Sequence, residues 1–442
     1  MLSNTNKNLL LLYIVITWTL LSILSAVFVN INIFIFGLLL NLIASITLNK
    51  SLEKLLLFQK VFFVNLLIVT FVYCVSIYQF DSPYYKGGSD DLSYELDAHE
   101  VVDQTGFFNY EDIRGNVVPK YHNSVGYIYA VSLIVRSSQL IGEFHTLLPR
   151  ILNGFFMGLI SVLAYNISNK YLKLSNKHSM ILAYIIGYFP ILCYTAAYTF
   201  RDIMLVYIIM STFYLWSQHK SYNFISKLSI IIITAIFIFI SLELRAVVAY
   251  YLIIIPFLFI FKFNKLNIRS LSQILIVLLI LYTLFYEKFI VFFNNTYNRY
   301  SEYLVTGADG LSNLIFNMSL LPFGIFFRAA YAFITPFPNL EYIESFWLSI
   351  GTIFQILFLP YLIIAYLNKR HFELKVIFVL IFISIITTTF TFRHIVMYLP
   401  FGLLLIGKVY FESKKNTKKL ILVISYTVFT FTFTLYSIMK YL

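Results

Sequence analysis

Charged residues are scarce in this sequence, and their scarcity excludes a soluble globular protein. Only 12% of the 442 residues are Asp, Glu, Lys or Arg, whereas 60% are hydrophobic. A soluble domain is about a quarter charged and about half apolar, so this chain has too few polar side chains to cover a water-exposed surface. Cysteine is scarcer still: Cys74 and Cys193 each stand alone inside an apolar run. Neither a disulfide framework nor a zinc site can be built from them.

Long apolar runs take the place of the missing charge. Runs of about 16 to 23 residues recur along the chain, which is the length that a helix needs to cross a bilayer. The first run is long enough to span, so we interpret it as a retained helix and not as a signal peptide. The sequence therefore predicts an all-α polytopic membrane protein with about 13 transmembrane helices. The predicted spans are 9–28, 31–48, 56–78, 147–167, 180–200, 203–217, 228–244, 246–262, 270–287, 345–367, 376–392, 395–411 and 420–439.

Basic residues are distributed unevenly between the two predicted sides of the membrane. With the N-terminus in the cytoplasm, the cytoplasmic segments hold 20 of the 32 Lys and Arg residues and three acidic residues, a net charge of +17. The opposite side holds 12 basic and 17 acidic residues, a net charge of −5. The positive-inside rule predicts this asymmetry. The formal charge of +12 therefore indicates topology, and nucleic acid is not expected as a partner.

Two long segments lie on the extracytoplasmic side in this topology, at about 79–146 and 288–344. Each contains an apolar stretch, at 125–135 and 314–334. Counting only one stretch as a span would invert the topology downstream of it and break the charge pattern. We therefore expect both to be interfacial or re-entrant helices. The predicted organisation is an N-terminal transmembrane module over 1–287, an outer loop over 288–344 and C-terminal transmembrane helices over 345–442.

Acidic residues gather in the first of these outer segments. Nine of the chain's twenty acids fall between residues 81 and 112. Gly87-Gly88 is a turn signal, Ser89 is a good N-cap, and Asp90 and Asp91 then occupy the first turn of a predicted helix. The N-terminal amides and the helix dipole favour ionised carboxylates there. The apolar side of this helix is predicted to lie on the membrane-embedded body and comprises Leu92, Tyr94, Leu96, Ala98 and Val101.

An ionised carboxylate at the membrane surface suits a general base that takes a proton from an acceptor hydroxyl. The plain alternative is that an outer loop is acidic because acids are solvated there and Lys and Arg are disfavoured. Resemblance adds weight to the chemical interpretation. The string Asp90-Asp91-x-x-Tyr94-x-x-x-Ala98-x-Glu100 resembles the first-loop signature of GT-C-type membrane glycosyltransferases, the family of the lipid A aminoarabinose transferase and the protein O-mannosyltransferases.

The resemblance implies a GT-C-like fold and site residues in the first outer loop. Asp90 matches the catalytic or acceptor-binding carboxylate of the family and Asp91 its second acid. Further on, residues 119–127 stand where the family has a turn before a juxtamembrane helix, although its Lys-Pro-Pro is absent here, and residues 148–153 resemble the entry to the next span. The substrate-binding residues that follow from this comparison are Tyr94, Glu100, Lys120 and His122.

Charged residues also mark the predicted outer ends of later helices. Charge near hydrocarbon is costly and tends to persist with a partner or a purpose. An arginine at the outer interface can hold a phosphate with its planar fork of donors. The alternatives are a local ion pair between Arg201 and Asp202, and arginines that extend their heads to the membrane surface. The further candidates for substrate binding are Arg201, Asp202, Arg245, Arg328 and Arg393.

The favoured function is an inverting glycosyltransferase with a polyprenyl-phosphate-linked sugar donor and an extracytoplasmic glycan, lipid or protein acceptor. No Gly-rich phosphate loop with its Lys-Ser/Thr pair occurs, which disfavours nucleotide-driven chemistry. The alternatives are a polymerase of lipid-linked repeat units and a lipid-linked oligosaccharide transporter or flippase. The histidines show no ligand spacing, so no metal site is predicted, and a requirement for a divalent cation stays open. Residue usage and the resemblance suggest a bacterial plasma membrane.

Overall fold

The computed structural model describes residues 4–104, 124–261, 311–318, 323–335, 342–368, 370–387 and 391–441. Within these residues the chain is α-helical and contains no strand, as the sequence predicts. The chain forms two compact units. The first comprises residues 1–253 and 338–351, and the second comprises residues 254–337 and 352–442.

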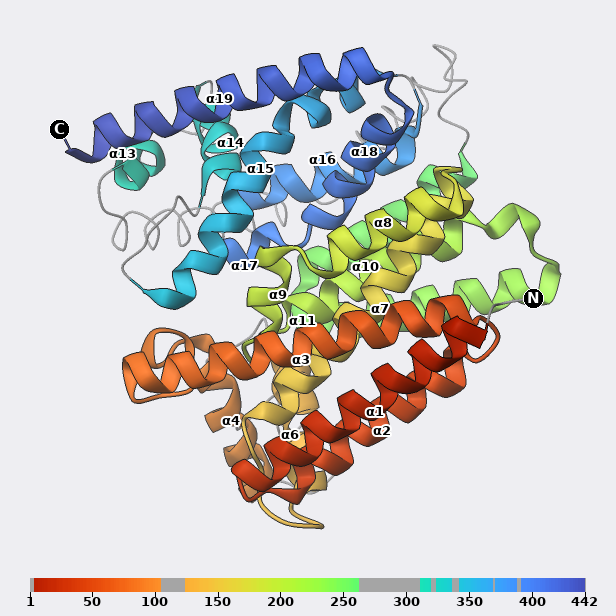
Figure 1. Ribbon diagram of the computed structural model, residues 1–442, viewed down its shortest axis with the longest axis vertical. Helices are drawn as coiled ribbons and strands as arrows, with labels where there is room; N and C mark the ends of the chain where they lie inside the picture. Colours follow the sequence, from red (N-terminus) through yellow and green to blue (C-terminus); the bar gives the residue numbers. More distant parts are fainter. Residues whose placement is uncertain are drawn as a thin grey trace, which may run out of the picture. The chain divides into compact units, whose positions relative to one another are not determined.

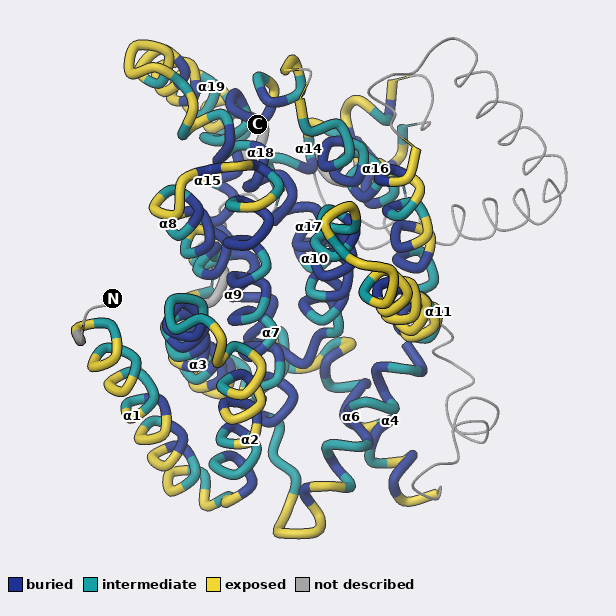
Figure 2. The backbone as a smooth tube through the Cα atoms, turned by 90° about the vertical axis from the view of Figure 1, so that its right-hand side faces the viewer, coloured by how far each residue is buried: buried dark blue, intermediate teal, exposed yellow. Residues whose placement is uncertain are grey.

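The first unit is a helical bundle, and two apolar helices, Leu52–Phe80 and Leu147–Asn166, form its centre. Its helices are α1 (Asn4–Val27), α2 (Ile31–Leu48), α3 (Leu52–Phe80), α4 (Asp90–Gln104), α6 (Val125–Ser138), α7 (Leu147–Asn166), α8 (Asn176–Gly187), α9 (Pro190–Ala196), α10 (Asp202–Ser217) and most of α11 (Phe224–Ile260). Helix α7 packs against α3, α8 and α10, and α1 and α2 lie beside α3 (Figure 1). Figure 2 shows the contrast in burial: α7 is largely enclosed, whereas α1 exposes much of its apolar surface.

A close approach of two backbones fixes the centre of this bundle. A Cβ atom placed on Gly158 of α7 would lie 2.6 Å from the Phe58 ring of α3. Only glycine leaves room for that ring, so the two helices meet there through Phe58, which is fully buried. Nearby, Asn41 of α2 and Gln59 of α3 exchange two side-chain hydrogen bonds of 3.0 and 2.9 Å. Such a buried polar pair is satisfied in only one register of the two helices.

The second unit contains shorter helices and the C-terminal helix. They are α13 (Leu311–Asn317), α14 (Ile325–Ile334), most of α15 (Ile343–Leu367), α16 (Phe372–Thr387), α17 (Phe392–Ile395), α18 (Leu399–Glu412) and α19 (Lys415–Tyr441). Helix α16 packs against α14 and α18. Tyr398 lies at their centre, where its hydroxyl donates to the Ala332 carbonyl at 3.4 Å.

Described helices occupy every predicted span except 270–287, which lies outside the described residues. Seven of these helices are long and apolar enough to cross a membrane, or eight if the bent pair α8 and α9 forms one span. The chain is thus a multi-pass, all-α membrane protein, while the count of 13 spans remains a prediction. The apolar stretch 125–135 lies in α6, a helix of 14 residues, and the described part of the stretch 314–334 contains the end of α13 and the whole of α14, helices of 7 and 10 residues. Each of these helices is shorter than the roughly 20 residues that a span requires.

Two predicted spans differ from straight helices. The predicted span 180–200 bends by 50° between α8 and α9, where Pro190 begins the second helix. Proline lacks an N–H and disfavours helical geometry in the residue before it, which explains the break. The predicted spans 228–244 and 246–262 belong to one element, α11, which breaks at the residue that separates the two predictions. Arg245 has extended backbone angles (φ −167°, ψ 101°) and divides α11 into two helices.

Cysteine accessibility tests the predicted orientation. In a background with Cys74 and Cys193 replaced by serine, Ser89→Cys should react with an impermeant thiol reagent in intact cells, and Asn176→Cys should not. Asn176 is exposed in the structure, so protection of its cysteine would report the membrane barrier and not burial within the protein. Labelling at Asn176→Cys with protection at Ser89→Cys would reverse the orientation.

Candidate active site

The turn between α3 and α4 is built from residues that favour tight backbone geometry. Helix α3 ends at Phe80, and the capping residue Asp81 adopts the left-handed conformation at φ 51°. Gly87 and Gly88 follow with φ of 83° and 149°, which side chains disfavour. The Ser82 hydroxyl closes the turn by donating to the Gly87 carbonyl at 3.1 Å. Helix α4 then begins at Asp90, so the predicted helix start is confirmed.

The buried side of α4 differs from the predicted one. Leu96 is 60% exposed and Leu92 only partly buried, so the leucine side does not form the packed face. The buried side instead carries two carboxylates, Asp91 and Glu95, one helical turn apart. They share the stripe of positions i, i+3, i+4 and i+7 with the apolar residues that pack α4 onto the rest of the unit. The buried residues of α4 are Asp91, Tyr94, Glu95, Ala98, Val101 and Val102.

The two adjacent aspartates lie in different environments. Asp90 is exposed, whereas Asp91 is fully buried. The backbone N–H of Tyr85 donates to Asp91 Oδ2 at 2.8 Å, and Oδ1 has no hydrogen-bond partner among the described residues. Burial raises the pKa of Asp91, against the lowering effects of the Tyr85 hydrogen bond and the charge of Arg150. A carboxylate with a raised pKa and an unbonded oxygen has the properties of a general base.

Glu95 is 3% exposed and receives three hydroxyl hydrogen bonds. Thr146 and Thr199 donate to Oε1 at 2.6 and 2.8 Å, and Tyr84 donates to Oε2 at 2.9 Å. Burial raises the pKa of Glu95 although the charge of Arg150 and these hydrogen bonds lower it. Because its oxygens are already engaged, Glu95 is better suited to hold the turn, α4 and the start of α7 together than to accept a proton.

Arg150, from the first turn of α7, is fully buried and supplies the positive charge of this site. Its Nη2 donates to the Pro83 carbonyl at 2.7 Å, while Nε and Nη1 have no partner within the described part of the chain. The guanidinium carbon lies 5.3 Å from the centre of the Tyr73 ring and 5.5 Å from that of Tyr198. Such rings stabilise a cation whose water has been removed. We call Asp91, Glu95 and Arg150 the buried charged site.

Two residues close to Arg150 in the sequence, Asn153 and His145, shape the surroundings of the site. Asn153, one turn further along α7, donates to the carbonyls of Tyr198 and Phe200 at 2.8 and 3.0 Å. These bonds hold the segment that supplies Thr199. His145 precedes α7, and burial together with the charge of Arg150 lowers the pKa of His145 to about 4. His145 is therefore uncharged at neutral pH.

A second polar network gathers several of the predicted substrate-binding residues. Asp202 pairs with Arg245 at 3.5 Å and not with the adjacent Arg201, so the local ion pair considered from sequence is not formed. Arg201 instead donates to the Ser124 hydroxyl and, at 2.6 Å, to the Leu244 carbonyl. Ser124 also lies 3.3 Å from the Tyr94 hydroxyl. Tyr94 of α4 thus joins the buried charged site to the turns at Arg201 and Arg245.

The remaining predicted site residues lie elsewhere. Glu100 is exposed and accepts a hydrogen bond of 3.1 Å from Gln104 one turn later. Lys120 and His122 lie outside the described residues. Arg328 and Arg393 belong to the second unit, where Arg328 is 1% exposed and donates to the Phe316 carbonyl at 3.1 Å.

Sequence reasoning did not single out Glu95 or Arg150. The signal for Glu95 was its spacing of four residues from Asp91, which places both on one helix face. The signal for Arg150 was an arginine in the first turn of an apolar span, where a charge requires a partner. Comparisons of the chain with family models, curated proteins and solved structures return no match.

Proposed function

We propose that this protein is an inverting membrane glycosyltransferase. It moves a sugar from a polyprenyl-phosphate donor to a glycan, lipid or protein acceptor outside the cytoplasm, and Asp91 is its base. The observation that carries the proposal is the enclosed Asp91 carboxylate, whose Oδ1 has no hydrogen-bond partner among the described residues and whose pKa is raised by burial. The resemblance to GT-C-type enzymes also expects a carboxylate in the first turn of a helix that follows an apolar span, although it matches Asp90 to the catalytic acid and Asp91 to the second one.

In the proposed reaction an acceptor hydroxyl attacks the anomeric carbon of the donor sugar. The hydroxyl proton passes to Asp91 Oδ1, and the bond between the anomeric carbon and the phosphate oxygen breaks. The phosphate leaves with the bonding electrons and gains negative charge. Arg150, with two nitrogens that lack partners in the described structure, is the cation best placed beside Asp91 to stabilise that charge. We propose it for this role ahead of Arg245, Arg328 and Arg393, the candidates that the sequence suggested.

Access to this site requires movement of the turn at residues 82–88. Asp91 is fully buried, and the turn bonds to it through Tyr85 and to Arg150 through Pro83. Both hydrogen bonds are made by backbone groups of the turn. When the turn moves away, Asp91 and Arg150 can form hydrogen bonds with a substrate in their place, and no side chain has to be displaced. The enclosed arrangement corresponds to a closed state, which excludes water from the reacting groups.

The same structure supports a transporter less well than it supports a glycosyltransferase. Broken helices mark the binding sites of many transporters, and α8 and α9 form such a break. However, the carbonyl of Gly187 at the break accepts from Asn65 at 3.1 Å and from the Cys193 thiol at 3.5 Å. The break is therefore satisfied by the protein itself. The predicted setting of the proposed enzyme is a bacterial plasma membrane, with 13 spans and the N-terminus in the cytoplasm.

Mass spectrometry of lipid-linked sugars and surface glycans tests the proposal. Cells that carry the Asp90→Asn, Asp91→Asn double variant should accumulate a polyprenyl-phosphate monosaccharide and lack one sugar in a surface glycan. Accumulated repeat units on polyprenyl diphosphate would instead indicate a polymerase. Unchanged pools, with the variant present in the membrane at the normal level, would contradict both activities and leave the transporter.

A further inference from the structure

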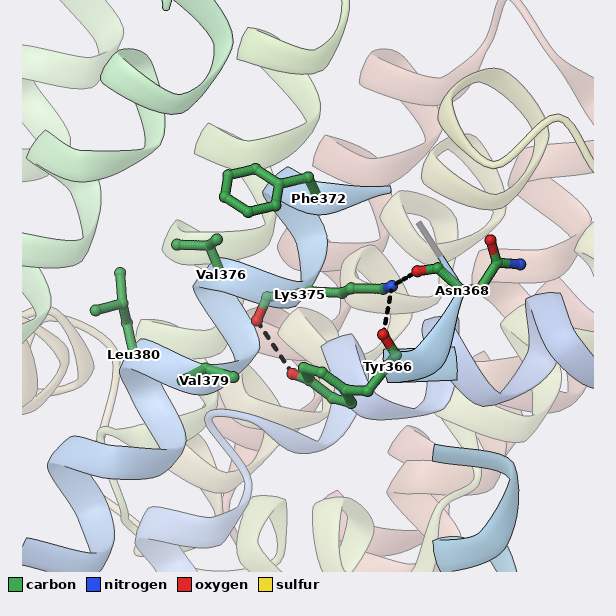
Figure 3. Close-up of a pocket in the computed structure, with 7 residues that line it drawn as sticks. All are labelled: Tyr366, Asn368, Phe372, Lys375, Val376, Val379 and Leu380. Carbon is green, nitrogen blue, oxygen red and sulfur yellow. Dashed lines mark hydrogen bonds between the residues drawn. The ribbon is translucent and has the colours of Figure 1, made fainter. Parts of the chain in front are cut away.

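A pocket in the second unit combines a buried ammonium group with an apolar wall. Its volume is about 480 Å³, within the range of small-molecule sites. Figure 3 shows the Lys375 ammonium turned toward Asn368 and Tyr366, with the apolar side chains of α16 on the other side of Lys375. The lining residues are Tyr366, Asn368, Phe372, Lys375, Val376, Val379 and Leu380.

Lys375 is held in place by the end of the preceding helix. It is 9% exposed, and its Nζ donates to the carbonyls of Asn368 and, at 3.2 Å, of Tyr366. The Tyr366 hydroxyl donates in return to the Lys375 carbonyl at 3.1 Å. Two of the three ammonium hydrogens are thus used to satisfy carbonyls at the C-terminus of α15. The third ammonium hydrogen is not used by these two carbonyls and is the donor offered to a ligand in the pocket.

The charges around the pocket are mainly positive. Burial, followed by the charge of Lys408, lowers the pKa of His371 to about 4, and the charges of Lys375 and Arg370 act in the same direction. Lys408 is compensated by Glu412, which lies 2.5 Å from it, whereas no acid is found among the described residues that line the pocket. The electrostatic environment therefore favours an anion.

The apolar wall identifies the kind of anion. Phe372, Val376, Val379 and Leu380 follow one face of α16 at positions i, i+4, i+7 and i+8. This face begins beside Lys375 and continues into a helix whose sequence predicts a membrane span. A free phosphate would use only the ammonium, while a lipid would use the ammonium and the wall together. The charge pattern of the sequence places this end of α16 at the cytoplasmic surface, where anionic lipids gather.

We propose that the Lys375 pocket binds an anionic glycerophospholipid, with the phosphate on the Lys375 ammonium and an acyl chain along α16. The proposal is independent of the glycosyltransferase activity, because it uses only residues of the second unit. The pocket would hold a lipid of the surrounding bilayer at the junction of α15 and α16.

Native mass spectrometry of the purified full-length protein in detergent tests this site. Titrated with phosphatidylglycerol, the protein should bind one lipid more tightly than it binds phosphatidylcholine of the same chain length. Loss of one charge-assisted hydrogen bond in Lys375→Gln should weaken phosphatidylglycerol binding on the order of tenfold. Val379→Trp keeps the Lys375 ammonium but places a bulky side chain where the acyl chain would lie. It should weaken phosphatidylglycerol binding by a similar factor. Lys220→Gln, at an exposed lysine, is the matched control and should bind as the unaltered protein does.

Three outcomes would overturn the proposal. The first is equal binding of the two lipids by the unaltered protein, a comparison that depends on no variant. The second is displacement of phosphatidylglycerol by millimolar inorganic phosphate together with normal binding by Val379→Trp, which would assign the pocket to free phosphate. The third is normal binding by both pocket variants. If Lys375→Gln fails to fold, Val379→Trp and the lipid comparison still decide.

Discussion

Replacing Asp91 with asparagine should lower sugar transfer by about a hundredfold to ten-thousandfold, the range in which general bases contribute to rate. Asparagine has nearly the same shape and can keep the hydrogen bond from the Tyr85 N–H to its side-chain oxygen. It cannot take up the acceptor proton at the position of Oδ1. The accumulated lipid identifies the donor. The rate at which the purified protein then transfers sugar from this donor to the acceptor measures the loss.

Two other acids of α4 make this test specific. Asp90→Asn removes a carboxylate that is exposed, and we expect a smaller loss than for Asp91→Asn. Asp103→Asn removes an exposed acid from the last turn of the same helix and should leave transfer unchanged. Activity of the unaltered enzyme should also fall as the pH drops through the raised pKa of Asp91. Full activity in Asp91→Asn, or a larger loss in Asp90→Asn, would remove Asp91 as the base.

Replacing Arg150 with methionine should destabilise the first unit. Arg150→Met keeps much of the side-chain volume but removes the charge-assisted hydrogen bond to the Pro83 carbonyl and the positive charge that opposes the raised pKa of Asp91 and Glu95. Loss of a hydrogen bond to a charged group typically costs about 1.5–3 kcal/mol. The thermal unfolding temperature of the detergent-purified protein should fall accordingly. Lys177→Met is the control, because Lys177 is an exposed residue of the same unit. It should change the stability by no more than about 0.5 kcal/mol, as surface substitutions usually do.

The pH dependence of this loss separates charge from packing. Burial raises the pKa of Asp91 and Glu95 in the folded protein, and Arg150 opposes the rise. A carboxyl whose pKa is raised on folding contributes its stability below its unfolded pKa and loses it as the pH rises through the folded pKa. In Arg150→Met both folded pKa values rise further. The variant should therefore be more strongly destabilised at pH 8 than at pH 5, whereas a loss that is equal at both pH values would indicate packing alone.

The helices of this protein were largely predictable because they depend on local information. Long apolar runs predicted the long helices. Gly87-Gly88, followed by Ser89 and two acids, predicted the start of α4. The buried face of α4 was not predictable in the same way. Leu96 is more apolar than Glu95, so the sequence of α4 alone predicts that the leucine is buried, whereas the structure buries Glu95. Glu95 is buried because Thr146 and Thr199, which are distant in sequence, supply its hydrogen bonds.

The pairing of charges shows the same limit. The topology predicted that Arg201, Asp202 and Arg245 lie at outer turns, and the structure brings these turns together. Sequence adjacency suggested that Arg201 pairs with Asp202. The extended backbone of Arg245 instead brings its side chain within 3.5 Å of Asp202, and Arg201 turns to Ser124 and Leu244. Which partner a charge takes depends on tertiary contacts that no local pattern contains.

The burial of Glu95 also sets an order of events during synthesis. Thr199, one of its hydrogen-bond donors, follows it by 104 residues, and Arg150 is inserted before Thr199. Burying a carboxylate without these groups is costly, so α4 cannot dock when it first leaves the ribosome. At 5–20 residues per second, the wait for Thr199 is roughly 5–20 s. The segment with the catalytic candidate thus reaches its final place only after α7 and α9 have entered the bilayer.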